Sequence, residues 1–272
     1  MPTVRPITFV VPVSSQGEIL QDNFLSSPCL NEPHNHQILI QENFTSAAAA
    51  FNDAIDRSLN DLIVFIHQDI SLPKSWLLQV NQALGHLDDT DPNWGVLGCW
   101  GASPEDGCRG YIYSNGLGVL GAPFAHPVPV QTLDEIVLIL RKSSGLRFDE
   151  RLPNFHLHGA DICMAAAEKG MRSYVISALC VHNTNMYLIL PKEFYKSYKY
   201  LKQRWEAELP IQTACIQITR FDVPMYTRRL REVYLRYFRQ KQLHKARAQD
   251  VSRLLEEVDT ILHKTSVSEQ SA

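Results

Sequence analysis

Hydrophobic residues follow two alternating spacings over the first 85 positions. Residues 7–13, 37–41 and 61–67 are short, β-branched apolar runs of the kind that forms buried strands. Residues 47–59 instead repeat apolar side chains every three or four positions, after a possible N-cap at Thr45-Ser46, and a second helical pattern follows Pro73. The alternation predicts an α/β fold whose mostly parallel sheet is flanked by helices, as in a Rossmann-like domain. Residues 14–36, rich in Ser, Pro and Asn, are predicted to be mostly loop.

The pattern changes twice further along the chain. Further strands are predicted at 94–100, 111–113, 117–120, 136–140 and 173–181, and a short helix at 160–169, with Gly170 as its C-cap. From residue 191 the chain reads as mainly helical. We therefore predict an α/β catalytic domain over 1–190 and a basic helical extension over 191–272.

Charge divides the chain in the same way. Residues 190–264 hold 16 Lys and Arg against 9 Asp and Glu, whereas residues 1–189 hold 10 against 19. An acidic front half without a recognised motif argues against nucleic-acid binding. The six cysteines form no C-x-x-C pair, which indicates reduced thiols and a cytoplasmic location. Because no window reaches the length of a spanning helix, any membrane contact is expected to be peripheral.

The first chemical signal is the polar triplet His67-Gln68-Asp69, which follows the apolar run 62–66 directly. Ligands of open α/β sheets bind beyond the carboxyl ends of the strands. A carboxylate at that place is poorly solvated unless a cation or hydrogen-bond donors satisfy it. The alternative is that Asp69 caps the following helix.

Two longer segments share one family resemblance. Residues 38–69 hold a strand, a polar turn, a helix with Ala and Asn, and a strand ending in an acid; residues 146–182 hold Phe-Asp-Glu, a helix with an acid in its first turn, Gly170, a strand and a His. In this order they resemble the donor and acceptor halves of family 2-type glycosyltransferases with a GT-A fold, closest to the subgroup with His-Gln-Asp in place of Asp-x-Asp. The resemblance implies inverting transfer of a hexose from a nucleotide sugar, a UDP-sugar first, to a glycan or lipid-linked acceptor.

The resemblance also implies roles for residues of the donor half. Asp69 and His182 would hold Mn²⁺ or Mg²⁺, which would offset the charge of the departing diphosphate. His67 replaces the family's first Asp and would contact the donor's ribose or diphosphate beside Gln68. The remaining donor-binding residues would be Pro12, Val13 and Ser14 along the nucleoside, Glu42 or Asn43 at the base edge, and Asn52, which would tie its helix to the donor loop.

The acceptor half leaves the general base open between two residues. Counting back from Gly170 places Asp161 at the family's second Asp and leaves His158-Gly159 where its first acidic pair stands. We predict Asp161 as the base, with His158 as the alternative. Asp149 and Glu150 would shape the acceptor pocket.

The stretch 220–247 supports two interpretations. It holds nine Lys and Arg and an aromatic stripe at near-helical spacing, so it either lies on an anionic membrane surface or packs on the catalytic domain. For the whole chain, a sugar-nucleotide pyrophosphorylase is disfavoured because the loop at 14–18 has no basic residue. A non-catalytic sugar or nucleotide-sugar binding module on the same fold remains the alternative to an enzyme.

Overall fold

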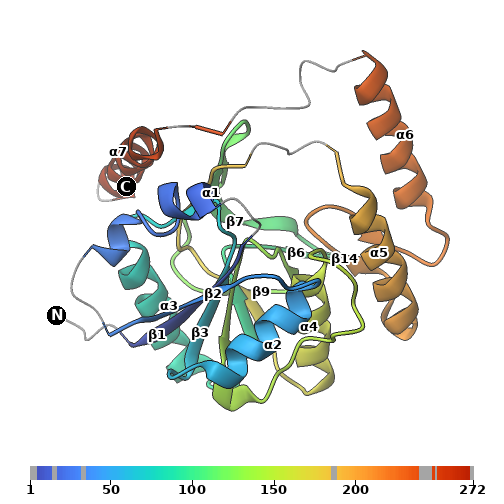
Figure 1. Cartoon of the computed structure of the whole chain (residues 1–272), viewed down its shortest axis with the longest axis horizontal. Helices are drawn as coiled ribbons and strands as arrows, with labels where there is room; N and C mark the ends of the chain where they lie inside the picture. The colour runs from blue at the N-terminus through green and yellow to red at the C-terminus, as the bar shows by residue number, and fades with distance from the viewer. Residues whose placement is uncertain are drawn as a thin grey trace.

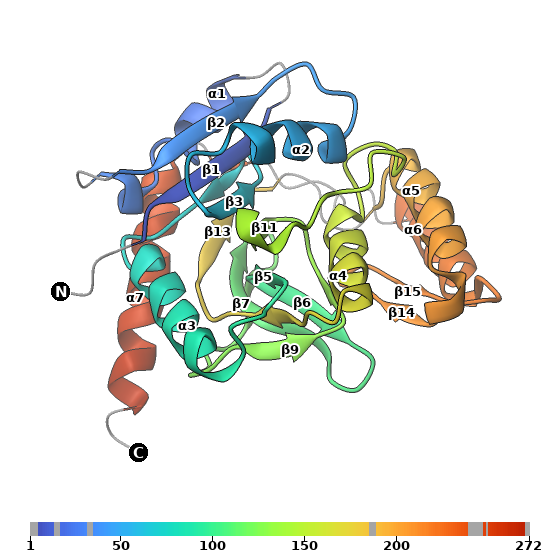
Figure 2. The same ribbon diagram turned by 90° about the horizontal axis from the view of Figure 1, so that it is seen from below.

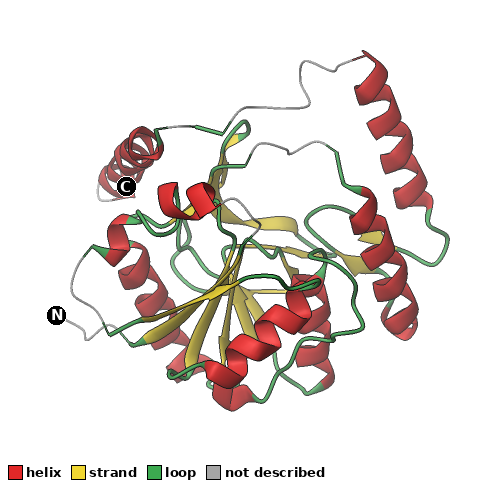
Figure 3. Ribbon diagram, viewed as in Figure 1, coloured by secondary structure: helices red, strands yellow, loops and turns green. Residues whose placement is uncertain are grey.

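The computed structural model describes residues 5–13, 17–31, 35–184, 189–238, 247–248 and 250–269. A seven-stranded sheet with helices on both faces forms its centre (Figures 1 and 3). Its strand order is β2 (Gln37–Gln41), β1 (Ile7–Pro12), β3 (Leu62–Ile66), β11 (Val137–Arg141), β5 (Val96–Gly98), β12 (Ser173–Val175), β9 (Val128–Val130). Only β11 and β9 run against the direction of the others. The predicted α/β class, with a mostly parallel sheet and flanking helices, is confirmed.

Two helices bury the two faces of this sheet. Successive strand residues point to opposite faces, so Phe9 joins the core under α3 (Trp76–Thr90), whereas Val10 joins the core under α2 (Ala47–Arg57). The hydroxyl of Ser46 caps α2 by accepting a hydrogen bond from the Ala49 N–H at 3.3 Å. The predicted strands and helices of this half therefore form where the apolar spacing placed them, although α2 ends at Arg57 rather than at residue 59.

Part of the segment predicted to be loop is helical. It contains α1 (Gly17–Asp22) and a 3₁₀ helix at Pro28–Leu30. Leu20, Phe24 and Cys29 are buried in the core on the α3 side of the sheet. Burial of these few apolar residues stabilises a segment whose composition alone indicates a loop.

A second sheet begins where two segments of the chain, after β3 and after β12, leave the first sheet. Its order is β10 (Thr132–Leu133), β6 (Trp100–Ser103), β7 (Gly107–Ser114), β13 (Cys180–His182), β4 (Ile70–Ser71), with β8 (Gly118–Gly121) also paired to β7. The single strand predicted over 173–181 was wrong, because β12 pairs with β5 in the first sheet and β13 pairs with β7 in the second. A continuous apolar run does not specify its partner strands, so the sequence could not show this change of sheet.

The C-terminal region is mainly helical, as predicted, but it also contains a small hairpin. Its elements are α5 (Lys192–Arg204), a 3₁₀ helix (Glu206–Glu208), the hairpin β14 (Ile211–Gln212) and β15 (Gln217–Ile218), α6 (Val223–Phe238) and α7 (Val251–Glu269). A further 3₁₀ helix at Lys142–Ser144 precedes α4 (His158–Glu168). Residues of α4, α5 and the hairpin share one apolar core, and α7 packs on β7 and β13. The boundary at 190/191 stays a prediction.

The structure bears on two predictions about membranes, the absence of a spanning helix and the packing of the stretch 220–247. Among the described residues, no helix combines the length and apolarity needed to cross a bilayer. Of the aromatic stripe in 220–247, Met225 is buried in the shared core, but Leu230, Tyr234 and Tyr237 are exposed. Packing of the whole stripe on the catalytic domain, one of the two interpretations, is therefore wrong for the described residues.

Candidate metal centre

The transition from the first sheet to the second places Asp69. The chain leaves β3 at His67, turns with a hydrogen bond from the Ile70 N–H to the His67 carbonyl at 3.2 Å, and enters β4. Strand β4 pairs antiparallel with β13, which sets His182 opposite Ile70. The turn at the carboxyl end of β3 therefore meets the end of β13, and Asp69 lies beside His182, 113 positions further along the chain.

Three possible metal ligands converge there. Ligand-type atoms of His67, Asp69 and His182 all lie within 4.8 Å of one another. The Nε2 atom of His182 lies 3.5 Å from Asp69 Oδ1, and the two imidazole rings meet edge to face with centroids 6.0 Å apart. Two imidazole nitrogens and one carboxylate oxygen suit Mn²⁺ better than Mg²⁺, which prefers oxygen ligands. The donor set fits the predicted divalent cation, with His67 as an additional ligand.

The electrostatics of the cluster favour a charged carboxylate. Burial alone would raise the pKa of Asp69, but His182, His67 and Arg247 together hold that pKa well below its usual range. Burial lowers the pKa of His67. Burial would also lower the pKa of His182, but the adjacent Asp69 carboxylate reverses this and raises it. A neutral His67 and an ionised Asp69 suit metal binding, whereas His182 would have to release its proton to bind a cation, so cation binding at this cluster should weaken at low pH.

The sequence reasoning missed Arg247. Its Nη2 donates to Asp69 Oδ2 at 3.1 Å, and its Nε donates to the Asn183 carbonyl at 3.2 Å. Asn183 also exchanges side-chain hydrogen bonds with the backbone of Ala248, at 2.8 and 3.0 Å, which fixes this segment beside β13. The only sequence signal was one more arginine in a basic stretch, because nothing local indicates that residue 247 returns to residue 69.

The predicted nucleoside-binding residues lie at neighbouring strand ends. Pro12 pairs with Gln41 in the β1–β2 ladder, and the Val13 N–H donates to the Gln41 carbonyl at 3.0 Å. Glu42 and Asn43 follow directly and are exposed, with Asn43 in the left-handed region at φ 64°. Ser14 lies outside the described residues. The structure thus places the tips of β1 and β2 together, at the same edge of the sheet as the carboxyl end of β3.

Asn52 contacts a different part of the molecule from the one predicted. Its Nδ2 donates to the Phe148 carbonyl and to Glu150 Oε1, both at 2.9 Å, and its Oδ1 accepts from the Phe148 N–H at 3.0 Å. The predicted link to the donor loop is therefore corrected: Asn52 ties α2 to the segment 148–150. One buried amide satisfies both backbone groups of Phe148, which the sequence spacing of 96 residues could not show.

Asp161 is fully engaged by side chains of the C-terminal region. Arg204 Nη1 donates to its Oδ2 at 2.7 Å, and Trp205 Nε1 donates to its Oδ1 at 2.8 Å. The Asp161 side chain is 1% exposed, and burial raises its pKa to about 6 although both donors oppose the rise. The same Arg204 atom lies 2.6 Å from Asp149, which also accepts from Arg151 at 2.9 Å. Asp149 and Asp161 thus anchor the end of α5.

His158 lies in an aromatic environment at the start of α4. Its ring meets Phe51 edge to face, with centroids 5.1 Å apart, and lies 6.1 Å from the Phe148 ring. Neither ring nitrogen has a hydrogen-bond partner among the described residues, and burial lowers the pKa of His158 well below its usual value. A protonated His67 would lower the pKa of His158 further.

Asp134 and Glu135 lie between the start of α4 and the end of β3, and the sequence analysis did not identify them. A Cβ on Gly159 would come 2.5 Å from the Leu133 carbonyl oxygen, so only glycine allows α4 to approach the segment 133–135 this closely. Asp134 is partly exposed, and its charge raises the pKa values of His67 and His182. Burial raises the pKa of Glu135 to about 8, and its Oε1 accepts from the Leu157 N–H at 2.9 Å.

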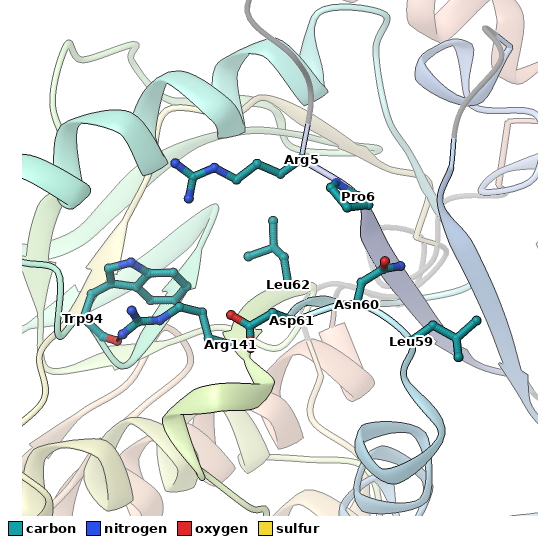
Figure 4. Close-up of a pocket in the computed structure, with 8 residues that line it drawn as sticks. All are labelled: Arg5, Pro6, Leu59, Asn60, Asp61, Leu62, Trp94 and Arg141. Carbon is teal, nitrogen blue, oxygen red and sulfur yellow. Dashed lines mark hydrogen bonds between the residues drawn. The ribbon is translucent and has the colours of Figure 1, made fainter.

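The larger described cavity lies away from this cluster. It measures about 350 Å³ and lies at the amino ends of β1 and β3, where Arg141 stacks over Trp94 at 4.4 Å (Figure 4). Arg141 donates to the carbonyls of Pro92 and Trp94, both at 2.6 Å, and Arg5 pairs with Asp88. None of the residues that line this cavity belongs to the cluster of His67, Asp69 and His182. A cavity of about 10 Å³ lies beside Asp134, Glu135 and Leu157.

Comparisons with known proteins find only distant similarity. No family model matches the chain. A Fuscovulum blasticum protein with the name "ATP synthase subunits region ORF 6" is 25% identical over 155 residues, which cover 54% of this chain and 61% of that protein.

Solved structures are similar at the level of overall shape. The Pyrobaculum calidifontis mannosyltransferase PcManGT, in complex with GDP-Man and Mn²⁺, is 14% identical with a TM-score of 0.49, over 76% of this chain and 65% of that one. TarS of S. aureus is 15% identical with a TM-score of 0.48, over 73% of this chain and 39% of that one. The chain thus spans less than two thirds of each of these proteins. Similarity this low establishes neither a family nor an activity.

Proposed function

We propose that this protein is a glycosyltransferase of the GT-A type that uses a nucleoside-diphosphate sugar as its donor. The observation that carries the proposal is the convergence of His67, Asp69 and His182 within 4.8 Å, at the edge where β1, β2 and β3 end. Ligands of open α/β sheets bind at this edge. A nucleoside along Val13 and Glu42 would direct its diphosphate toward this cluster.

The cluster would hold a divalent cation, Mn²⁺ in preference to Mg²⁺. His67, Asp69 and His182 would be its protein ligands, and the cation would stabilise the negative charge that develops on the departing diphosphate. Arg247, 3.1 Å from Asp69, would be a second positive group: when a cation takes its place on Asp69, its Nη2 would donate to a phosphate oxygen while its Nε keeps the Asn183 carbonyl. The donor would be a UDP-sugar or a GDP-sugar carrying a hexose.

An inverting transfer also needs a base beside the acceptor hydroxyl. Asp161 and His158 stay predictions, and in the described structure Asp161 reaches an acceptor only if its bonds to Arg204 and Trp205 break. We add Asp134 as the stronger candidate because it is partly exposed. It accepts one hydrogen bond from a backbone N–H, at 3.2 Å, and it acts electrostatically on both histidines of the cluster. Its carboxylate would take the proton of a glycan or lipid-linked acceptor.

The six cysteines support the proposed cytoplasmic location. All six are free, and four of them are buried. Free thiols are typical of reducing compartments such as the cytoplasm.

The inaccessibility of Asp161 and His158 favours one competing function, a non-catalytic module that binds nucleotide sugars. Both functions predict donor binding, so binding and turnover must be measured separately. Thermal melting of the full chain with UDP, GDP and their hexose derivatives, each with Mn²⁺ or with chelator, tests binding. We expect a higher melting temperature for one nucleotide class in Mn²⁺ and a smaller increase in chelator.

Turnover separates the enzyme from the binding module. We expect the donor identified by melting to be hydrolysed slowly in Mn²⁺, and His182→Ala to reduce both the Mn²⁺ affinity and the hydrolysis rate by about tenfold or more. His126→Ala, a change at an exposed histidine outside the cluster, is the control. Donor binding without hydrolysis or transfer to any acceptor would support the binding module, and absence of donor binding would contradict both functions.

A further inference from the structure

Helix α6 uses only one side to contact the rest of the protein. Met225 and Glu232, two helical turns apart, are its buried side chains. Glu232 accepts hydrogen bonds from the Leu190 N–H at 3.1 Å and from the Tyr195 hydroxyl at 2.9 Å. These contacts fix which side of α6 faces inward.

The opposite side of α6 is apolar and exposed. Its residues recur every three or four positions, which places them along one side of a helix. We call this surface the outer face of α6: Val223, Tyr226, Leu230, Val233, Tyr234, Tyr237 and Phe238, all exposed. Leu230 is 70% exposed and Tyr237 78%, so nothing in the described structure covers the centre or the end of this face.

Positive charges border the outer face on both sides. The helical period places Arg229 and Arg236 along one border and Arg231 along the other, and all three are exposed. The one acidic residue of α6 is Glu232, which is turned inward and pairs with Arg228 at 3.2 Å. The exposed part of the helix therefore combines an apolar face with cationic borders and carries no compensating acid.

The position of α6 leaves this face accessible to a flat surface. In the view of Figure 1, α6 forms the outer edge of the molecule, and α5 lies between it and the sheets. The view from below agrees, with α5 and α6 side by side at the far side from α3 (Figure 2). A projecting helix of this kind presents a convex apolar face, not a groove for a peptide.

We propose that α6 binds the surface of an anionic lipid bilayer, with its outer face inserted among the headgroups. Apolar and aromatic residues on one side, bordered by arginines, are the pattern that holds interfacial helices in the plane of such a membrane. A second copy of this chain fits less well, because two outer faces in contact would bring their arginines together. The proposal does not depend on the proposed glycosyltransferase activity.

Flotation of the full-length protein with lipid vesicles tests the proposal. We expect binding to vesicles rich in phosphatidylserine and weak binding to pure phosphatidylcholine, with a loss of binding in high salt. Leu230→Asp should abolish the binding, and Arg231→Gln with Arg236→Gln should weaken it by roughly 10- to 30-fold. Circular dichroism and thermal melting check that both variants stay folded.

Two matched changes outside α6 serve as controls. Leu59→Asp alters a side chain that is 83% exposed at the end of α2, and Arg253→Gln removes an exposed arginine from α7. Both should leave vesicle binding unchanged. Equal binding to neutral and anionic vesicles, or equal loss in Leu59→Asp and Leu230→Asp, would overturn the proposal. So would a wild-type dimer in sedimentation velocity that Leu230→Asp dissociates without any vesicle binding.

Discussion

Two buried carboxylates, Asp69 and Asp161, occupy opposite electrostatic situations. Asp69 lies among two histidines and an arginine that together hold its pKa below the usual range, whereas burial raises the pKa of Asp161 to about 6 despite Arg204 and Trp205. The partners of Asp69 include two side chains that ligate metals when neutral. The partners of Asp161, Arg204 and Trp205, are hydrogen-bond donors and offer no ligand atom for a metal.

The difference teaches that burial of an acid does not identify its role. Both residues are buried, and both carboxylates pair with an arginine. The other partners differ: His67 and His182 offer further ligand atoms beside Asp69, so a cation could replace Arg247 there, whereas Arg204 and Trp205 offer Asp161 only hydrogen-bond donors. We therefore propose a catalytic role for the Asp69 cluster and a structural role for the bonds of Asp161 to Arg204 and Trp205, while Asp161 as the base stays a prediction.

The largest expected effect is the loss of turnover when the Asp69 cluster is changed. Asp69→Asn keeps the shape of the side chain but removes its charge, so we expect a loss of about 10³-fold or more in sugar transfer, equivalent to about 4 kcal/mol. The melting temperature should also fall, because the lowered pKa of Asp69 means that its ionised form stabilises the fold, so turnover is compared at a temperature where circular dichroism shows both proteins folded. Steady-state kinetics in Mn²⁺ would measure the loss, with the exposed Asp106→Asn as control. Full activity of Asp69→Asn would remove the site assignment.

Changes in the Asp161 cluster should lower the stability of the fold. Arg204→Met leaves Asp161 and Asp149 without their shared cation, and we expect a loss of about 3 kcal/mol in the free energy of unfolding. The pKa of Asp161 is about 6 in the folded protein, above its unfolded value of 3.8, so its stabilising contribution is complete below 3.8 and lost as pH rises through 6. Without Arg204 the pKa rises further, and the cost should be larger near pH 8 than near pH 5.

Urea denaturation of both proteins at the two pH values measures that difference. Arg151→Met, which removes a more exposed partner of Asp149, is the matched control and should cost less than Arg204→Met. A pH-independent cost for Arg204→Met would show that Asp161 is not the group that its cation stabilises.

A smaller effect on turnover distinguishes Asp134 from Asp161 as the general base. Asp134→Asn should reduce turnover by about 10²-fold without a comparable loss of donor affinity, as expected for a general base. Asp161→Asn should instead lower the melting temperature and leave the turnover of the folded protein nearly unchanged. Transfer rates and donor affinities of the two variants, measured in parallel, decide between them. The reverse pattern would return the base to Asp161.

The smallest expected effect concerns the link between α2 and the segment 148–150. Asn52→Ala leaves the N–H and the carbonyl of Phe148 without their partner, so we expect a loss of about 2 kcal/mol in the free energy of unfolding. Asn93→Ala, at an exposed asparagine, is the control. A stability change no larger than that of the control would contradict the structural role of Asn52.

Local patterns were sufficient for much of the fold. The runs at 7–13, 37–41 and 61–67 formed strands, and the Ser46 cap formed, because burial and capping depend on residues near in sequence. The loop prediction for 14–36 was wrong for 17–22 and 28–30, and the single strand over 173–181 was wrong, because long-range packing and partner choice decide such segments. The prediction that Asp69 and His182 lie together rested on the resemblance, and the structure does bring them within reach of each other.

The sequence by itself determined the strands and helices of the first half, the α/β class, and the place of Asp69 after a buried strand. Only the tertiary structure decided what surrounds that carboxylate. Arg247 reaches it across 178 positions, and Arg204 and Trp205 engage Asp161 from another helix. Apolar spacing records which side of an element is buried, but partners from distant segments follow from how sheets and helices pack, and no local pattern encodes that.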